Sequence, residues 1–128
     1  HTLIASIGFK QQKLWSVMGC MGADGQPQIQ FQTYSAMVDH GLDIQQAVQA
    51  PRWLSGRFAL GEARDTLHVE SRLSKQTLAA LDQRGHLLNR WGPWNELAGH
   101  AHGITLDPHS GLRTGGADPR SDGQAVGV

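Results

Sequence analysis

The beginning of the chain alternates apolar and less apolar residues in a way that predicts paired strands. An apolar residue recurs at every second place, at Leu3, Ala5, Ile7 and Phe9. This is the period of a β-strand. A polar break, Lys10-Gln11-Gln12, is followed by the mainly apolar run 14–18. We therefore expect an antiparallel hairpin.

The next segment, residues 26–40, has helical spacing. One apolar stripe consists of Ile29, Thr33, Ala36 and Met37, and further apolar residues between them predict a largely buried helix. Pro27 suits the first helical turn and Gly41 suits a C-terminal cap.

Two shorter helices are predicted from their capping residues. Asp43 is a good N-cap for a helix that Ala50-Pro51-Arg52 would end. Ser74 is a good N-cap for a helix that Gly85 would end.

The remaining segments are short and mostly extended. They comprise a loop over 53–72 with brief strands at 58–60 and 67–70, an extended piece at 86–88, a hairpin of 102–106 and 112–116 around the turn 107–111, and an irregular end at 117–128. This order favours a single α+β domain over residues 1–128, with helices packed on an antiparallel or mixed sheet rather than regular βαβ units.

Composition narrows the function classes. The 128 residues carry eleven basic and eleven acidic side chains without a cluster of either sign, so we expect no nucleic acid and no membrane surface as a partner. One cysteine permits no internal disulfide. The first residue is His1, which suggests a processed product or a fragment, and the compartment stays open between cytoplasm and periplasm.

The most informative motif is the glycine-rich segment Gly19-x-x-Gly22-x-x-Gly25, which joins an apolar run to a helix. Glycines permit close approach of a ligand, and a helix start presents backbone N–H groups suited to an anion or an oxyanion. The spacing fits neither the dinucleotide fingerprint nor the P-loop. A tight connection with glycines for packing alone is the other interpretation.

Several motifs occur together in one order. They are His1-Thr2-Leu3, Gly19-Cys20-Met21-Gly22-Ala23, Gly41-Leu42-Asp43-Ile44-Gln45-Gln46-Ala47 running into Ala50-Pro51-Arg52-Trp53, the pattern Leu-x-x-x-Gly-His at 81–86, and Asp118-Pro119-Arg120-Ser121-Asp122-Gly123. This ordered set resembles the C-terminal half of the small subunit of a γ-glutamyltranspeptidase (γ-glutamyltransferase, glutathione hydrolase).

The resemblance implies an N-terminal-nucleophile (Ntn) hydrolase with an αββα sandwich. A zymogen of this family cuts itself to expose a threonine, which attacks a γ-glutamyl amide such as glutathione and passes the acyl group to water or an amine. That threonine lies upstream of the matched region. The upstream part of the precursor is therefore an implied partner, no cofactor or metal is implied, and the chain alone is expected to be inactive.

The resemblance also assigns individual residues. Gly22 and Ala23 fall where the family has a glycine pair whose backbone N–H groups form the oxyanion hole, and Ala23 departs from that pattern. A positive φ at Ala23 would cost on the order of 1 kcal/mol. His1 and Thr2 fall where many members bind the substrate α-carboxylate. The arginines of Ala50-Pro51-Arg52 and Asp118-Pro119-Arg120 are interpreted as loop anchors.

Other functions remain open at this stage. A cephalosporin acylase-type segment would share the fold and the reaction but not the acyl group. The alternative from another class is a stand-alone binding or assembly module without catalysis. An isolated fragment is expected to form homo-oligomers through uncovered sheet surface.

Several histidines, the cysteine and two tryptophans have a structural role as the alternative to a functional one. His100 and His102, with His86 and an oxygen from Glu96 or Asp107, are a weak metal-site pattern. Cys20 is interpreted as a small buried residue rather than a nucleophile, and Trp91 and Trp94 as packing residues.

Overall fold

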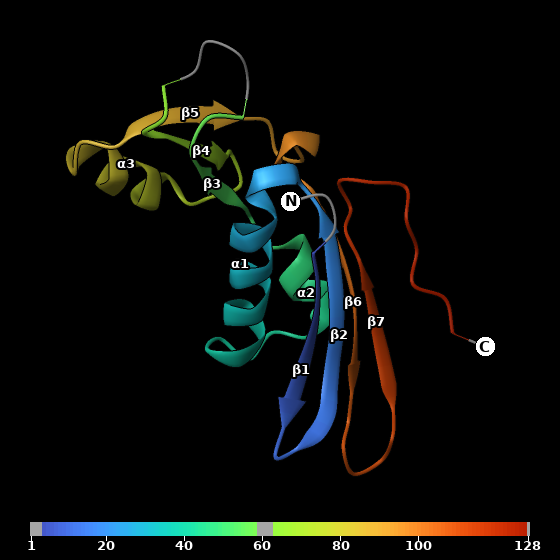
Figure 1. Ribbon diagram of the computed structural model, residues 1–128. Helices are drawn as coiled ribbons and strands as arrows, with labels where there is room; N and C mark the ends of the chain where they lie inside the picture. Colours follow the sequence, from blue (N-terminus) through green and yellow to red (C-terminus); the bar gives the residue numbers. More distant parts are fainter. Residues whose placement is uncertain (1–3, 59–62, 128) are drawn as a thin grey trace.

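A computed structural model describes residues 4–58 and 63–127 (Figure 1). The elements are β1 (Ile4–Lys10), β2 (Lys13–Met21), the 3₁₀ turn η1 (Ala23–Gly25), α1 (Gln26–Val38), α2 (Ile44–Gln49), β3 (Trp53–Ser55), β4 (Thr66–Glu70), α3 (Lys75–Gln83), β5 (Leu87–Trp91), the 3₁₀ turn η2 (Glu96–Ala98), β6 (His100–Leu106) and β7 (Arg113–Ala117). Within these ranges no helix is both long enough and apolar enough to span a membrane.

The larger sheet has four strands in the order β1-β2-β6-β7, and each neighbouring pair is antiparallel. Ile4 lies opposite Cys20, and Met21 lies opposite His100. The start of β1, the end of β2, the start of β6 and the end of β7 consequently meet at one end of the sheet (Figure 1). We call this the η1 end.

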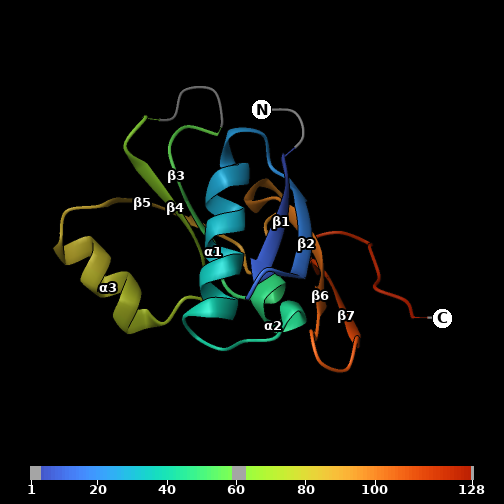
Figure 2. The ribbon, with the colours of Figure 1, turned by 60° about the horizontal axis from the view of Figure 1, so that its bottom comes forward.

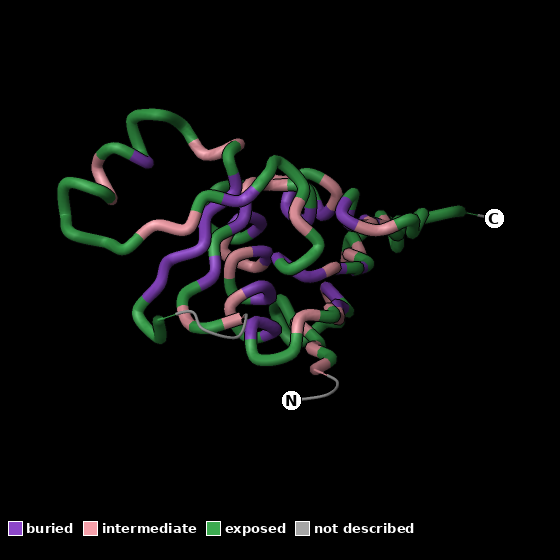
Figure 3. The backbone as a smooth tube through the Cα atoms, turned by 90° about the horizontal axis from the view of Figure 1, so that it is seen from above, coloured by how far each residue is buried: buried purple, intermediate pink, exposed green. Residues whose placement is uncertain are grey.

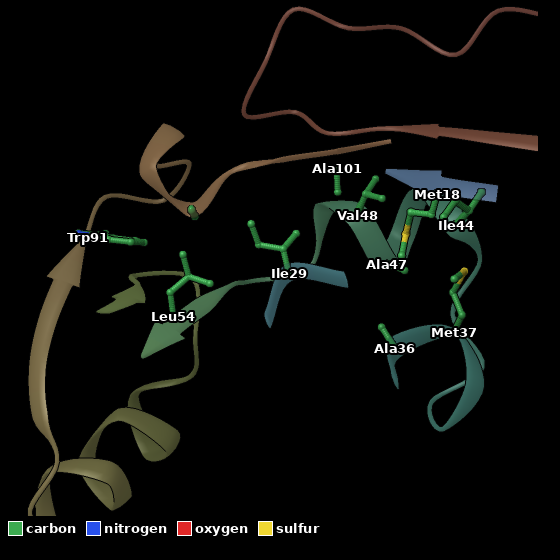
Figure 4. Packing of buried hydrophobic residues seen from close by; sticks show 11 residues of the cluster. Met18, Ile29, Ala36, Met37, Ile44, Ala47, Val48, Leu54, Trp91 and Ala101 are labelled. Atoms are coloured by element: carbon green, nitrogen blue, oxygen red, sulfur yellow. The ribbon is translucent and has the colours of Figure 1, made fainter. Parts of the chain in front are cut away.

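One face of this sheet is buried by α1 and α2. The hydrophobic cluster there consists of Met18, Ile29, Ala36, Met37, Ile44, Ala47, Val48, Leu54, Trp91, Ala98 and Ala101 (Figure 4). Leu54 and Trp91 belong to the second sheet, so one continuous core joins the two sheets.

The opposite face, called the outer face, carries apolar side chains that no described helix covers. Its exposed members are Ile7 (61%), Phe9 (66%), Val17 (42%), Met21 (54%) and Ile104 (47%). The predicted alternation in β1 is therefore present, but its apolar side points away from the helices. The inward Ser6 and Ser16 hydroxyls instead hydrogen-bond to the Tyr34 hydroxyl at 3.1 and 3.2 Å.

The smaller sheet has the order β3-β4-β5, with β3 antiparallel and β5 parallel to β4. A parallel neighbour requires a crossover, which α3 supplies. In Figure 2, α1 lies between the two sheets. The molecule is thus an α+β arrangement with one β–α–β unit, and the predicted fold class is confirmed.

Helix boundaries follow the predicted caps. The Asp43 side chain accepts a hydrogen bond from the Gln46 N–H at 2.7 Å, and the Asp43 N–H donates to Gln46 Oε1 at 3.0 Å. The Ser74 hydroxyl accepts from the Thr77 N–H at 3.0 Å. α1 ends at Val38, two residues before the predicted end at position 40.

Strand boundaries are less well predicted. β2 continues to Met21 because it pairs with β1 on one side and β6 on the other, so Gly19 and Cys20 are strand residues rather than turn residues. β3 is too short to produce a recognisable pattern. The strand predicted at 58–60 falls mostly outside the described residues, and Phe58 itself is not in a strand.

Glutamine side chains on α1 occupy open strand edges. Gln28 receives a hydrogen bond from the Ser55 N–H and donates to the Ser55 carbonyl, both at 2.8 Å. The Gln32 side chain likewise accepts a hydrogen bond from the Trp53 N–H at 3.2 Å and donates to the Trp53 carbonyl at 2.7 Å. A primary amide has the donor and acceptor of a peptide group, so α1 covers an edge that would otherwise be unpaired.

Candidate functional site

The glycine-rich turn lies at the η1 end and leads from β2 into α1. Gly22 has φ 157° and Ala23 has φ 44°. The Gly25 N–H donates to the Gly22 carbonyl at 2.8 Å, and the Gln26 N–H donates to the Ala23 carbonyl. These bonds close a 3₁₀ turn, and Pro27 follows in the first turn of α1.

The direction of the Gly22–Ala23 peptide group decides where the Ala23 N–H can donate a hydrogen bond. In a planar trans peptide the carbonyl and the N–H point in opposite directions. The Gly22 carbonyl points into the turn, toward the Gly25 N–H, so the Ala23 N–H of the same peptide points out of it. An outward N–H at the start of a helix is a suitable donor to an anionic oxygen.

Gly22 packs against the loop that precedes β6 and contains Gly99. A Cβ atom at Gly22 would collide with Ile29 Cδ1, and one at Gly99 would collide with the same atom and with the Met21 carbonyl oxygen. Gly99 also has φ 76°. Both positions therefore require glycine, and the loop before β6 supports the turn from behind.

Arg52 and Asp118 hold the loop before β6. Arg52 Nη1 donates to the carbonyls of Ala98 and Gly99 at 2.9 and 2.8 Å, while Arg52 Nη2 lies 2.9 Å from Asp118 Oδ2. The same carboxylate oxygen accepts from the Ala101 N–H at 2.9 Å. Arg52 and Asp118 are 2% and 0% exposed, which agrees with the interpretation of both motifs as loop anchors.

A second buried pair extends this network. Arg120 donates to Glu70 Oε1 and Oε2 at 2.7 and 2.6 Å and to Asp118 Oδ1 at 2.8 Å. Burial raises the pKa of Asp118 and of Glu70, but the neighbouring arginines outweigh it and hold both pKa values below the ordinary range. Both carboxylates are therefore ionised at neutral pH and serve as anchors.

The other candidates have structural surroundings. The Cys20 sulfur lies 3.6 Å from the Gln26 carbonyl, and burial raises the pKa of the thiol, which favours the unreactive protonated form. Trp91 stacks on His68 with ring centroids 4.7 Å apart, and Arg72 lies over the Trp94 ring. These contacts agree with the packing interpretation of the tryptophans.

The histidines do not come together as a metal site. In the described parts of the chain no group of three or more His, Cys, Asp or Glu side chains is arranged to hold a metal ion. His100 and His102 lie on β6, whereas His86 precedes β5 in the other sheet. His100 Nε2 is shielded from solvent and has no hydrogen-bond partner among the described residues.

The predicted site residues divide into two groups. Gly22 and Ala23 form the turn described above. His1 and Thr2 lie outside the described residues, which begin at Ile4, opposite Cys20 at the η1 end.

Two residues of this site, Glu70 and Gly99, were not predicted from the sequence. Glu70 ends a five-residue strand, Thr66–Glu70, whose members are all buried, and a strand-end carboxylate between Val69 and Ser71 gave no clear sign in the sequence that it would be buried with arginine partners. Gly99 gave no sign either, because its need for glycine comes from a neighbour distant in sequence.

Comparison with known proteins places these features in a family. The sequence profile described as Gamma-glutamyltranspeptidase matches residues 1–128. The chain is 41% identical over 128 residues to the glutathione hydrolase-like YwrD proenzyme of Bacillus subtilis, covering 100% of this chain and 24% of the relative. It is 39% identical over 127 residues to the oxamate amidohydrolase proenzyme of Klebsiella pneumoniae, covering 99% of this chain and 24% of that relative.

Solved structures give the same picture. The cephalosporin acylase from Bacillus halodurans matches with a TM-score of 0.78 and 31% identity, over 90% of this chain and 20% of that one. The γ-glutamyltranspeptidase from Pseudomonas nitroreducens complexed with L-DON matches with a TM-score of 0.79 and 23% identity, over 99% of this chain and 62% of that one, which is a likeness of fold. The chain thus spans 24% of the length of the curated relatives named above.

Proposed function

The chain belongs to the gamma-glutamyltranspeptidase family, and on that premise we propose that it is the C-terminal segment of an Ntn amidohydrolase that cleaves γ-glutamyl amides such as glutathione. In this proposal the chain supplies the oxyanion-hole turn, and the preceding part of the precursor supplies the nucleophilic threonine. The acyl group passes to water or to an amine.

The observation that carries the proposal is the outward Ala23 N–H. When a hydroxyl oxygen attacks an amide carbonyl carbon, the carbonyl oxygen gains negative charge as the tetrahedral intermediate forms. A fixed N–H donor stabilises that charge without having to reorganise. The Gly22–Ala23 peptide is fixed by the Gly25 N–H at 2.8 Å and by the close packing of Gly22 against Gly99.

The rest of the reaction requires groups from outside this chain. The free α-amine of an N-terminal threonine has a reference pKa of roughly 7.7 to 8.0, which suits it to take the proton from its own hydroxyl. The α-amine passes this proton to the leaving amine as the C–N bond of the tetrahedral intermediate breaks, and water or an acceptor amine then releases the acyl group from the threonine oxygen. His1 and Thr2 are proposed to bind the α-carboxylate of the donor.

A different acyl group is the second candidate. The oxamate amidohydrolase and the cephalosporin acylase named above share this chain's sequence at 39% and 31% identity. Each of the three reactions breaks an amide bond through a tetrahedral intermediate with a negatively charged oxygen, so the same backbone N–H donor can stabilise all three intermediates. Residues that bind the far end of the acyl group decide which acyl group is accepted. The family resemblance predicts a hydroxyl residue at position 1, where this chain has His1, and this difference is the reason to test the other two acyl groups.

The test is to express the full-length precursor that contains this chain and to follow self-cleavage together with amide hydrolysis. Glutathione, oxamate and a cephalosporin side-chain amide serve as parallel substrates. Self-cleavage with glutamate release supports the γ-glutamyl proposal, whereas activity on one of the other amides alone replaces it with that acyl specificity. A folded precursor that neither cleaves itself nor hydrolyses any of them contradicts the enzymatic proposal and favours a binding or assembly role.

A further inference from the structure

Gln26, the first residue of α1, bonds both to the proposed oxyanion turn and to the start of β1. Its backbone N–H donates to the Ala23 carbonyl and closes the turn. Its side-chain oxygen, Oε1, accepts a hydrogen bond from the Ile4 N–H at 3.0 Å. One residue therefore connects the turn to a strand that lies 22 positions earlier in the sequence.

A second glutamine of α1 bonds to the other polar backbone atom of Ile4. Gln30 donates from Nε2 to the Ile4 carbonyl at 2.7 Å. Residues four positions apart are neighbours on the surface of a helix, so the side chains of Gln26 and Gln30 reach the same point of β1. The N–H and the carbonyl of Ile4 are thus both bound to side chains of α1.

These hydrogen bonds are shielded from water. Gln26 is 1% and Gln30 is 7% exposed, and the described chain begins half-buried at Ile4, beside the N label in Figure 3. A hydrogen bond in such surroundings is stronger than one in water, and a buried group that loses its partner is not compensated by solvent. The two amides therefore hold Ile4 firmly against α1.

Ile4 is also the point where the proposed carboxylate-binding residues join the described fold. Thr2 precedes it by two positions and His1 by three. Two residues of chain span at most about 7 Å, so fixing Ile4 restricts where Thr2 can lie relative to the Ala23 N–H. A donor bound by its α-carboxylate at one end and by its carbonyl oxygen at the other requires a constant spacing between the two sites.

We propose that Gln26 is a positioning residue for the donor substrate: its side chain fixes the start of β1 and so sets the spacing between the α-carboxylate site and the oxyanion donor. The inference rests on the proposed function, because it takes His1 and Thr2 as the carboxylate site and Ala23 as the oxyanion donor. Gln26 acts through Ile4 and through its own backbone, and not on the substrate.

Two donors that differ only in the α-carboxylate test this role. γ-Glutamyl para-nitroanilide carries the carboxylate, whereas γ-aminobutyryl para-nitroanilide has a hydrogen atom in its place. The variant is Gln26→Met in the enzyme obtained from the full-length precursor. It keeps the backbone N–H that closes the turn and a side chain of similar length, but it removes the acceptor for the Ile4 N–H.

The expected effect is confined to the donor that carries the carboxylate. Loss of binding that is equal in the ground state and the transition state raises KM without lowering kcat, so KM of Gln26→Met for the γ-glutamyl donor should rise about fivefold or more with kcat within about twofold. The kcat/KM for the γ-aminobutyryl donor should change less than about twofold. Gln26→Glu should recover most of the loss, because a carboxylate oxygen also accepts a hydrogen bond and negative charge is favoured in the first turn of a helix.

The matched control is Gln28→Met on the same helix. The Gln28 amide bonds to Ser55 of β3 at 2.8 Å in both directions, so this variant should leave the ratio of kcat/KM between the two donors unchanged. Equal losses on both donors in Gln26→Met would show a general disturbance of the turn or the fold, and would overturn the inference.

Hydrogen exchange gives a readout that does not depend on activity. Exchange of the Ile4 amide, followed by mass spectrometry, should accelerate in Gln26→Met and not in Gln28→Met. Unchanged exchange at Ile4, or an unchanged donor ratio in an enzyme that hydrolyses the γ-glutamyl donor, overturns this inference and leaves the proposed function intact. An unsubstituted enzyme that does not hydrolyse the γ-glutamyl donor removes the proposed function and this inference with it.

Discussion

At the level of single residues, Ala23 is the position where sequence and backbone conformation disagree. Its φ of 44° lies in the left-handed region, which costs a non-glycine residue roughly 1 to 2 kcal/mol. The family resemblance drawn from the sequence predicts a glycine at this position. The strain is local to the turn that carries the proposed oxyanion donor.

We expect Ala23→Gly to stabilise the protein. Relief of the left-handed conformation exceeds the additional unfolded-state entropy of glycine, so the free energy of unfolding should rise by about 0.5 kcal/mol. Urea denaturation measures it. Ala79→Gly, on the exposed side of α3, is the control and should lower the same quantity by about 0.5 to 1 kcal/mol. Equal losses in both variants would show that Ala23 is not strained.

The lowered pKa values of Asp118 and Glu70 predict acid sensitivity. A carboxylate whose pKa is lower in the folded state stabilises the protein above its ordinary pKa of about 4, and this stabilisation is lost as the pH falls through the folded-state value. The free energy of unfolding should therefore decline as the pH falls below about 5.

Asp118→Asn should remove part of this decline. Breaking the pair with Arg52 lowers the free energy of unfolding at pH 7 by about 3 kcal/mol, and the curve between pH 5 and 3 becomes shallower. Denaturant titrations at several pH values provide the measurement. Asp82→Asn removes an exposed ion pair with Arg90 and should change the free energy of unfolding at pH 7 by less than about 1 kcal/mol; an equal loss in both variants would refute the assignment to the buried network.

At the level of elements, glutamine side chains determine how α1 joins the second sheet. Gln28 and Gln32 are one helical turn apart, and they meet Ser55 and Trp53, alternate residues of β3. Residues i and i+2 of a strand present their peptide groups to the same edge. The helix therefore acts as an additional strand for β3.

Gln28→Ala should loosen this edge. Loss of the side-chain amide leaves the Ser55 N–H and carbonyl to water, so amide exchange at Ser55 should accelerate and the free energy of unfolding should fall by about 1 kcal/mol. Hydrogen exchange followed by NMR provides the measurement. In Gln83→Ala on α3, where no side-chain hydrogen bond of Gln83 is found among the described residues, exchange at Ser55 should not change; acceleration in both variants would point to a global effect.

At the level of the whole molecule, the uncovered outer face predicts self-association of the isolated chain. Ile7, Phe9, Val17 and Ile104 expose 42% to 66% of their surfaces on one sheet face, which is typical of a surface meant for another layer. Light scattering should detect dimers or larger species. Val17→Lys, at the centre of this face, should shift the population toward monomer because a charge there disfavours burial.

A suitable control is Leu87→Lys, which changes an exposed leucine on the smaller sheet. It should leave the association unaltered. A chain that stays monomeric at high concentration without any substitution would show that the outer face needs no covering layer.

Much of the secondary structure could be predicted because its causes are local. Asp43 and Ser74 cap their helices through groups three residues away, and the hairpin of β1 and β2 needs only the two-residue alternation and a short break. The boundary of β2 could not be predicted in this way, because Gly19 and Cys20 stay extended through partners on β6.

Capping, periodicity and motif order are properties of neighbouring residues, so most elements, the α+β class, the family resemblance and the turn that carries the proposed oxyanion donor could be predicted from the order of the residues. Three features are visible only in the folded chain: Arg120 contacts Glu70 across 50 positions, Gly99 packs against Gly22, and the apolar side of β1 points away from the helices. These contacts join segments far apart in the chain, and they depend on where packing and hydrogen bonding place each backbone.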